Sequence, residues 1–332
     1  MVFFGSVPRI SRYCRIMGVS DLAAIVNRAQ HAKFTISEIQ PFIRNRLETP
    51  NEFPNNASLS KRLKEVSLGF YVWEMQLHHQ EYGKGGKETI ILLHGLLGSS
   101  RNWVTVGKLL AKDHHVVGLD LRNHGKSPHK PVMSYPTMVD DVCEWMDTQQ
   151  LSNAHLVGHS MGGKVAMLMA CNHPKRVSSM TIADIAPKDY DPHFKIAFDA
   201  MASVDPSRYR RIADVDNALA DYVEDTELRQ FLVTNLKRNE AGTFDWQVNL
   251  EGITRALQDI SVNPLRADMV YTGPALLLHG EESDYVKATD HGAIMRHFPT
   301  CKIVEVPEAR HNVHIENRHF FASEVSKLLR GE

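Results

Sequence analysis

A serine stands between two glycines in the stretch VGHSMGG, where Gly158 and Gly162 flank Ser160. A strand that turns directly into a helix strains the residue at the bend, and the neighbours two positions away on either side must then be very small. The apolar run at 154–157 is typical of a buried strand, and the spacing that follows is typical of a helix ending before Pro174. The pattern predicts a nucleophilic hydroxyl at a sharp turn. Without a base elsewhere, the same spelling would be only a glycine-rich turn.

A serine hydroxyl is a weak nucleophile near neutral pH, so it needs a base and a group that orients that base. The segment VPEARHNVH offers His311 and His314 after the last strand-like run. His311 follows that run sooner and is the better candidate, whereas His314 is expected to pack against a cap or face solvent. Two carboxylates, Asp184 and Asp284, each follow a strand-like run between the serine and the histidines. Residue order alone does not separate these two acids.

Acyl transfer also needs donors for the negative charge that develops on the carbonyl oxygen. The backbone N–H of Met161, directly after the serine, is one candidate. The second is the N–H of Leu96, in the loop LLHGLLGSS after an early strand-like run. His94 is expected to tie this loop down, and His124 in DLRNHGKSP to support a tight turn, rather than to act on substrate.

Neither a G-x-G-x-x-G after a strand nor a Walker A sequence occurs, so no nucleotide cofactor is expected. His311 and His314 lack a third ligand at a recognisable spacing, and no metal is expected either. The net charge of −1 argues against a nucleic-acid partner, and no apolar run approaches the roughly 20 residues that span a bilayer. The four cysteines are scattered and are expected to be reduced thiols. The expected partner is a small molecule, and the oligomeric state is not predicted.

Strand-like and helix-like runs alternate over 67–187 and again over 269–332. Such repeated units predict an α/β fold with a mostly parallel central sheet flanked by helices. An opening hairpin is expected from a strand-like run at 67–79 and the turn that follows it. Between the two parts, residues 188–268 are charged and rich in helical patterns, with no recognisable buried strand. This segment is predicted to be a helical cap, inserted before the last two strand–helix units and covering the carboxyl ends of the strands.

The N-terminal residues 1–34 contain four arginines and one lysine against a single acid. This composition is typical of a mitochondrial transit peptide. Met17 is an alternative start, which would remove half of the signal and leave the protein in the cytoplasm. Residues 35–66 are expected to be a linker, because the stretch 48–62 within them is polar and contains two prolines and several asparagines and serines.

Five ordered motifs give the chain a resemblance to the abhydrolase domain-containing protein 11 group of the α/β-hydrolase superfamily, which includes YbfF-type bacterial esterases and yeast ethanol acetyltransferases. The resemblance covers about residues 67–330, and its motifs are HGLLGSSRNW, DLRNHGKSPH, MSYPTMVDDV, VGHSMGGKVAM and DIAPKDY. It implies an α/β-hydrolase fold with a triad of Ser160, Asp184 and His311.

The chain departs from the group's pattern in two places. Arg310 and Asn312 stand where relatives usually have glycine and tryptophan around the base, and they are expected to change the pocket mouth or the acyl preference. Asp284 stands where relatives tend to lack an acid, so it remains a candidate to share or replace the role of Asp184.

Three functions follow from these observations. The first is a serine hydrolase that cleaves carboxylic esters or thioesters through an acyl-enzyme. The second is an alcohol acyltransferase with the same triad, which passes an acetyl group from acetyl-CoA to ethanol. The third is a non-enzymatic scaffold with a hydrolase fold, which would predict a broken triad position. Water exclusion by the cap decides between the first two, and the sequence does not show it.

Overall fold

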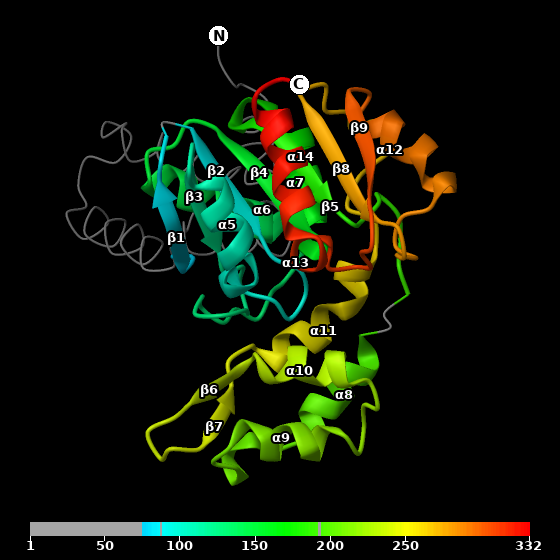
Figure 1. Ribbon diagram of the computed structural model, residues 1–332. Coiled ribbons are helices and arrows are strands. Elements are labelled where there is room, and N and C mark those ends of the chain that lie inside the picture. The colour runs from blue at the N-terminus through cyan, green and yellow to red at the C-terminus, as the bar shows by residue number, and fades with distance from the viewer. Residues whose placement is uncertain (1–74, 87, 192–193) are drawn as a thin grey trace, which may run out of the picture. The chain divides into compact units, whose positions relative to one another are not determined.

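The computed structural model describes residues 75–86, 88–191 and 194–332 (Figure 1). The predicted transit peptide at 1–34, the predicted linker at 35–66 and the first residues of the predicted core lie outside the described residues. Their predictions therefore remain predictions.

A mostly parallel sheet forms the centre of the described residues. Its seven strands lie in the order β1-β3-β2-β4-β5-β8-β9, and only β1 runs antiparallel to its neighbour. The strands are β1 His79–Lys84, β2 Thr89–Leu93, β3 His115–Leu119, β4 Ala154–His159, β5 Val177–Ala183, β8 Ala275–Gly280 and β9 Cys301–Val306. The prediction of an α/β fold with a mostly parallel sheet is confirmed.

The predicted opening hairpin is wrong. The expected turn residues Tyr82–Lys84 belong to strand β1 itself, and β1 pairs with β3 rather than with β2. Strand β2 already has parallel partners on both sides, β3 and β4, so its backbone groups are used. The aromatic residues at 67–74 that suggested the first strand lie outside the described residues.

Side chains of the central strands are buried on both faces of the sheet. In β2, Ile90 and Leu92 join one apolar cluster, and Ile91 and Leu93 join the other, as the alternation of a strand requires. Helices α5 (Val104–Leu110) and α14 (Arg318–Leu329) pack together on the first face. Helices α6 (Tyr135–Thr148) and α7 (Met161–Asn172) cover the second (Figure 1).

Local sequence signals start and stop these helices. Ser134 caps α6 by accepting a hydrogen bond from the backbone N–H of Thr137, and Pro136 lies in the first turn, where no donor is lost. Helix α7 ends just before Pro174. The remaining core helices are α12 (His291–His297) and the short α13 (Val313–Glu316), with 3₁₀ turns at Ser100–Trp103, Pro174–Arg176 and Ala288–Asp290.

The insert between β5 and β8 carries the helices that were predicted as a cap. They are α8 Lys195–Ser203, α9 Ile212–Leu219, α10 Thr226–Val233 and α11 Leu250–Ser261, with a 3₁₀ turn at Pro206–Arg208 (Figure 1). A short antiparallel hairpin, β6 (Leu236–Arg238) with β7 (Phe244–Trp246), was not expected from the sequence. The start of α11 is joined to the loop after β3, because the Asn249 side chain donates to the Asn123 side chain and the Asn249 N–H donates to the Asn123 carbonyl.

Candidate active site

Ser160 sits on the turn between β4 and α7 with φ 50° and ψ −115°, a conformation that non-glycine residues rarely adopt. The two glycines make the turn possible. A Cβ on Gly158 would lie 2.3 Å from the Gly162 carbonyl oxygen, and one on Gly162 would lie 2.3 Å from the Leu93 carbonyl oxygen. The steric reason inferred from the sequence is therefore present in the structure.

His311 and Asp184 are in contact. The Nδ1–H of His311 donates to Asp184 Oδ2 at 2.8 Å, which leaves Nε2 as the free lone pair of the imidazole. Asp184 follows β5 directly, has φ 51° and is fully buried. Its carboxylate also accepts the N–H of Gly280 at Oδ1 and the hydroxyl of Ser283 at Oδ2. Three donors therefore hold this carboxylate fixed in position.

Asp284 does not reach the base. Its side chain is 96 % exposed and forms an ion pair with Lys287 at 3.2 Å. The residues on either side of Asp284 contact the dyad of Asp184 and His311 instead. Ser283 donates to Asp184, and the ring of Tyr285 stacks on that of His311 at 3.6 Å with 14° between the planes. The sequence contained no signal for Ser283 and Tyr285 beyond their place beside a candidate acid.

A second imidazole supports the base from the other side. The Nε2–H of His159, the residue before the nucleophile, donates to the His311 carbonyl at 2.9 Å. Its ring lies 4.6 Å from that of His311 and 4.5 Å from that of His314. Burial holds the pKa of His159 well below its usual value, so it stays neutral beside the base.

His314 is buried in the core, which corrects the expectation that it packs against the cap or faces solvent. Its ring lies 4.2 Å from the ring of Trp103, and burial lowers its pKa to about 3. His124 is also buried and neutral, with its Nδ1–H donating to the Arg122 carbonyl and a pKa lowered to about 3. Both residues are structural in this arrangement.

The loop after β2 comes close to the nucleophile. A Cβ on Gly95 would lie 2.7 Å from His159 Nδ1 and 3.4 Å from Ser160 Cβ, so only glycine fits there. His94 ties this loop down as expected, because its Nδ1–H donates to the Gly95 carbonyl and its Nε2 accepts the N–H of Leu121.

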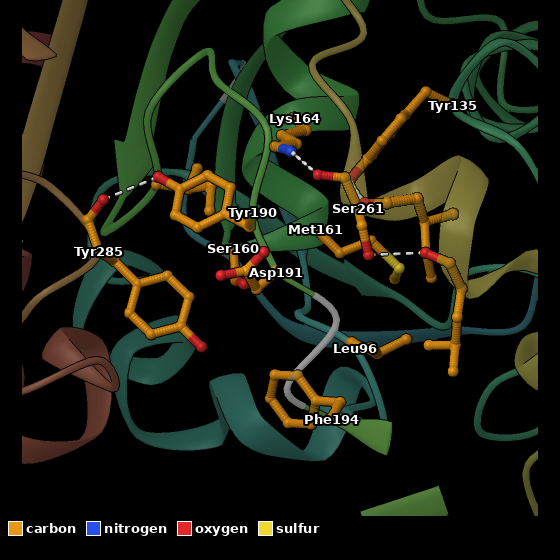
Figure 2. A pocket seen from close by; sticks show the side chains of 13 residues that line it. Leu96, Tyr135, Ser160, Met161, Lys164, Tyr190, Asp191, Phe194, Ser261 and Tyr285 are labelled. Carbon is orange, nitrogen blue, oxygen red and sulfur yellow. Dashed lines mark hydrogen bonds between the residues drawn. The ribbon is translucent and has the colours of Figure 1, made fainter.

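The two residues predicted to supply the oxyanion donors line the same pocket. Leu96 and Met161 both line it together with Ser160 (Figure 2). Met161 is the first residue of α7, and its N–H has no acceptor within the helix. The next loop residue, Leu97, has φ 58°, and its carbonyl accepts the side-chain amide of Asn235 from the insert at 3.0 Å. The insert thereby fixes the loop that carries Leu96.

The pocket itself is formed by the core and by α11. Apolar and aromatic side chains dominate its lining, which is Leu96, Tyr135, Ser160, Met161, Lys164, Ile185, Tyr190, Asp191, Phe194, Leu257, Ile260, Ser261 and Tyr285 (Figure 2). A largely apolar pocket with a few polar groups is typical of a site for a small molecule.

Arg310 and Asn312 are exposed and are not among the described residues that line this pocket, and their effect on the pocket mouth or the acyl preference remains a prediction. Arg310 instead pairs with Glu227 of α10 at 2.7 Å, which joins the loop of the base to the insert.

Within residues 75–332, apart from the three that are not described, no group of His, Cys, Asp or Glu could hold a metal ion. In the same part of the chain, each helix is too short or too polar to cross a bilayer.

The family profile described as alpha/beta hydrolase fold matches residues 88–318. The chain is 37% identical over 257 residues to the sn-1-specific diacylglycerol lipase ABHD11 of Danio rerio, covering 74% of this chain and 80% of the relative. It is 30% identical over 258 residues to ethanol acetyltransferase 1 of Cyberlindnera fabianii, covering 70% and 76%. A solved structure described as a marine microorganism esterase has a TM-score of 0.74 and 35% identity, covering 76% of this chain and 99% of its own.

Proposed function

The chain belongs to the α/β-hydrolase fold family and to its ABHD11-type group, and from that premise we propose that it is a serine hydrolase that cleaves carboxylic ester or thioester bonds through an acyl-enzyme. The chain is an enzyme of this superfamily rather than a scaffold. The observation that carries the proposal is the set of three groups found at the carboxyl ends of the strands. They are a serine in a strained turn, a histidine with a free Nε2, and a buried carboxylate that accepts from the Nδ1–H of that histidine.

In the proposed acylation step, Ser160 Oγ attacks the ester carbonyl while His311 Nε2 takes its proton. Asp184 holds the Nδ1–H and stabilises the imidazolium that forms. The negative charge on the carbonyl oxygen is met by the N–H groups of Leu96 and Met161. The imidazolium then gives its proton to the leaving alcohol or thiol, and an ester of Ser160 remains.

Deacylation repeats the sequence with water as the nucleophile. His311 takes a proton from water, the hydroxide attacks the acyl carbonyl, and the carboxylic acid leaves as Ser160 recovers its proton. The stack of Tyr285 on one face of the His311 ring and the bond from His159 to its backbone keep the imidazole in one orientation for both steps.

A fluorophosphonate probe and a simple ester substrate test the proposal. The wild-type protein should be labelled and should release acid from the ester. The variant Ser160→Ala should keep its fold, lose the label, and retain only the residual ~10³–10⁴-fold acceleration over water that oxyanion donors and binding provide. Ester cleavage by this variant near the wild-type rate would show that the serine is not the nucleophile.

Transfer to an alcohol is the second candidate, and the similarity to an ethanol acetyltransferase favours it. The same acyl-enzyme would react with ethanol in place of water, giving ethyl acetate when acetyl-CoA is the donor. Analysis of products from acetyl-CoA with and without ethanol separates the two, because hydrolysis gives only acetate.

Mitochondrial localisation is proposed on the composition of residues 1–34, which is rich in arginine and poor in acids. We also propose that residues 188–268 form the cap and that residues 35–66 are a linker. A chain that starts near Ser58 should keep its activity in vitro and lose the mitochondrial signal in cells. A full-length protein that stays in the cytoplasm would contradict the transit peptide.

A further inference from the structure

A buried lysine, Lys164, lies one helical turn after the nucleophile on α7 and lines the same pocket (Figure 2). It is only 2% exposed, and four residues of helix place it about 6 Å from Ser160 along the axis. Its ammonium donates to two carbonyls at the C-terminal end of α11, those of Ser261 at 3.2 Å and of the following residue Val262 at 2.9 Å. The ammonium has no role in the proposed mechanism.

No carboxylate neutralises the ammonium within ion-pair distance among the described residues. The groups that face it from the surrounding elements are the ring of Tyr190 at 4.8 Å, the ring of Tyr135 of α6 at 5.7 Å and the two α11 carbonyls. Asp189 acts on it only from a distance, and Asp191, which also lines the pocket, is exposed and screened by solvent.

Burial of an uncompensated charge is costly, and proteins normally provide a partner of opposite charge. The cost is visible in the pKa of Lys164, which burial lowers to about 8 although Asp189 opposes the shift. The two carbonyls accept hydrogen bonds from two of the three N–H donors of the ammonium. Because the carbonyls and the two aromatic rings are neutral, the net positive charge remains. A retained cation beside a nucleophile is therefore suited to an anion that arrives with the substrate.

We propose that Lys164 binds a carboxylate of the substrate, and that the preferred substrates are esters or thioesters with a carboxylate a short chain away from the bond that is cleaved. The inference depends on the proposed acyl-enzyme at Ser160. The carboxylate can lie on the acyl side, as in a half-ester of a dicarboxylic acid, or on the alcohol side, as in an ester of a hydroxy acid. The ammonium supplies a charge-assisted hydrogen bond in either case.

Matched pairs of substrates test this proposal. On the acyl side, monomethyl glutarate is compared with its ω-amide, methyl 5-amino-5-oxopentanoate, which has the same shape without the charge. On the alcohol side, 4-acetoxybutanoate is compared with 4-acetoxybutanamide. The measured quantity is the ratio of kcat/KM for acid over amide within each pair. At pH 7 the wild-type ratio should exceed about tenfold in at least one pair, and that pair identifies the side.

Variants of the lysine then assign the preference. Lys164→Met should lower the ratio at least about tenfold, and Lys164→Arg should preserve most of it. The matched control is Tyr135→Phe, which removes the hydroxyl that donates to the Ile260 carbonyl at the same end of α11 but leaves the charge in place. Its ratio should remain as in the wild type. A ratio is used because a disturbed α11 lowers the acid and the amide together.

The pH dependence of the wild type gives a test that needs no variant. The ammonium that binds the carboxylate is present below pH 8 and is lost as the pH rises through about 8, so the acid-over-amide ratio should fall there. In Lys164→Arg the ratio should stay level over the same range.

Two results would overturn the inference: wild-type ratios near one for both pairs, or a high ratio that Lys164→Met retains. Either would make Lys164 only an anchor for α11. Fluorophosphonate labelling of Ser160 accompanies every protein, since a labelled enzyme without carboxylate preference refutes this inference alone. An unlabelled wild type refutes the proposed function.

Discussion

Replacing Asp184 with asparagine separates the two candidate acids. Asparagine has nearly the same shape, and it tolerates the left-handed conformation that Asp184 adopts at φ 51°. The fold should therefore survive. An amide oxygen at the place of Oδ1 can still accept from Gly280, and the amide nitrogen then lies at the place of Oδ2, where its N–H faces His311 and forces Nδ1 to accept. The imidazole proton then lies on Nε2, so Nε2 cannot accept the proton of Ser160.

The expected loss in kcat is up to about 10⁴-fold, which corresponds to about 5.5 kcal/mol of barrier. Ser283→Ala removes one hydrogen bond to the carboxylate and should cost roughly tenfold. Asp284→Asn is the matched control, because its carboxylate is 96 % exposed and pairs only with Lys287. A surface pair of this kind contributes about 0–1 kcal/mol, so kcat should change by no more than about twofold.

Steady-state hydrolysis of one ester by the three single variants and by the double Asp184/Asp284 variant provides the comparison. The reasoning fails if Asp284→Asn loses most of the activity while Asp184→Asn remains within tenfold of the wild type. Moderate losses in both, with a collapse only in the double variant, would mean that the acids substitute for each other, which the separation of Asp284 from His311 excludes in this structure.

Three further predictions follow from the same structure. Gly162→Ala should reduce fluorophosphonate labelling at least about a hundredfold, because its Cβ would lie 2.3 Å from the Leu93 carbonyl, whereas Gly292→Ala, with nothing within 4 Å, should label normally. Asn235→Ala should lower kcat about tenfold with little change in KM, since the insert no longer holds the oxyanion loop; an effect on KM alone would contradict this. The pKa of His314 is lowered by burial from 6.5 to about 3, so its contribution to stability is lost as the pH falls below 6.5, at about 1.4 kcal/mol per pH unit. Urea unfolding at pH 7 and pH 5 should show this loss as the difference between two proteins: the wild type should lose about 2 kcal/mol more than His314→Phe, because the lowered pKa values of His124 and His159 act equally in both.

The nucleophile turn could be predicted from the sequence because its sterics are local. Gly158 and Gly162 lie two residues from Ser160, and the distances that exclude a Cβ involve the backbone of the same turn and of the neighbouring strand β2. A strand buried on both faces also leaves a local signal, a continuous apolar run, which β2 shows.

The choice of acid could not be made from the residues alone. Asp184 and Asp284 follow β5 and β8, which are neighbours in the sheet, so both chains leave the same edge. What separates them is the path of each loop: the first turns inward at a positive φ, and the second presents Ser283 and Tyr285 to the dyad while Asp284 faces solvent.

Long-range contacts account for the other differences. Lys164 has the spacing of a helix interior, and only the approach of α11, about a hundred residues later in the chain, makes it a pocket residue. The pairing of β1 with β3 depends on the neighbours that β2 has already taken. His314 was expected to pack against the cap or face solvent, and only the approach of Trp103, a residue about two hundred positions earlier in the chain, buries its ring.

The most direct test of the acyl-enzyme is to trap it. The wild type and a His311→Ala variant are mixed with an ester whose acyl group is released slowly from the enzyme. The samples are quenched in acid and digested, and the masses of the peptides are measured by mass spectrometry. The mechanism predicts the mass of the acyl group on the peptide that contains Ser160, transiently in the wild type, and in the variant only as a slow accumulation, because both steps lose their base. An acyl group on any other residue, or turnover in the wild type with no acylated peptide at any quench time, would contradict it.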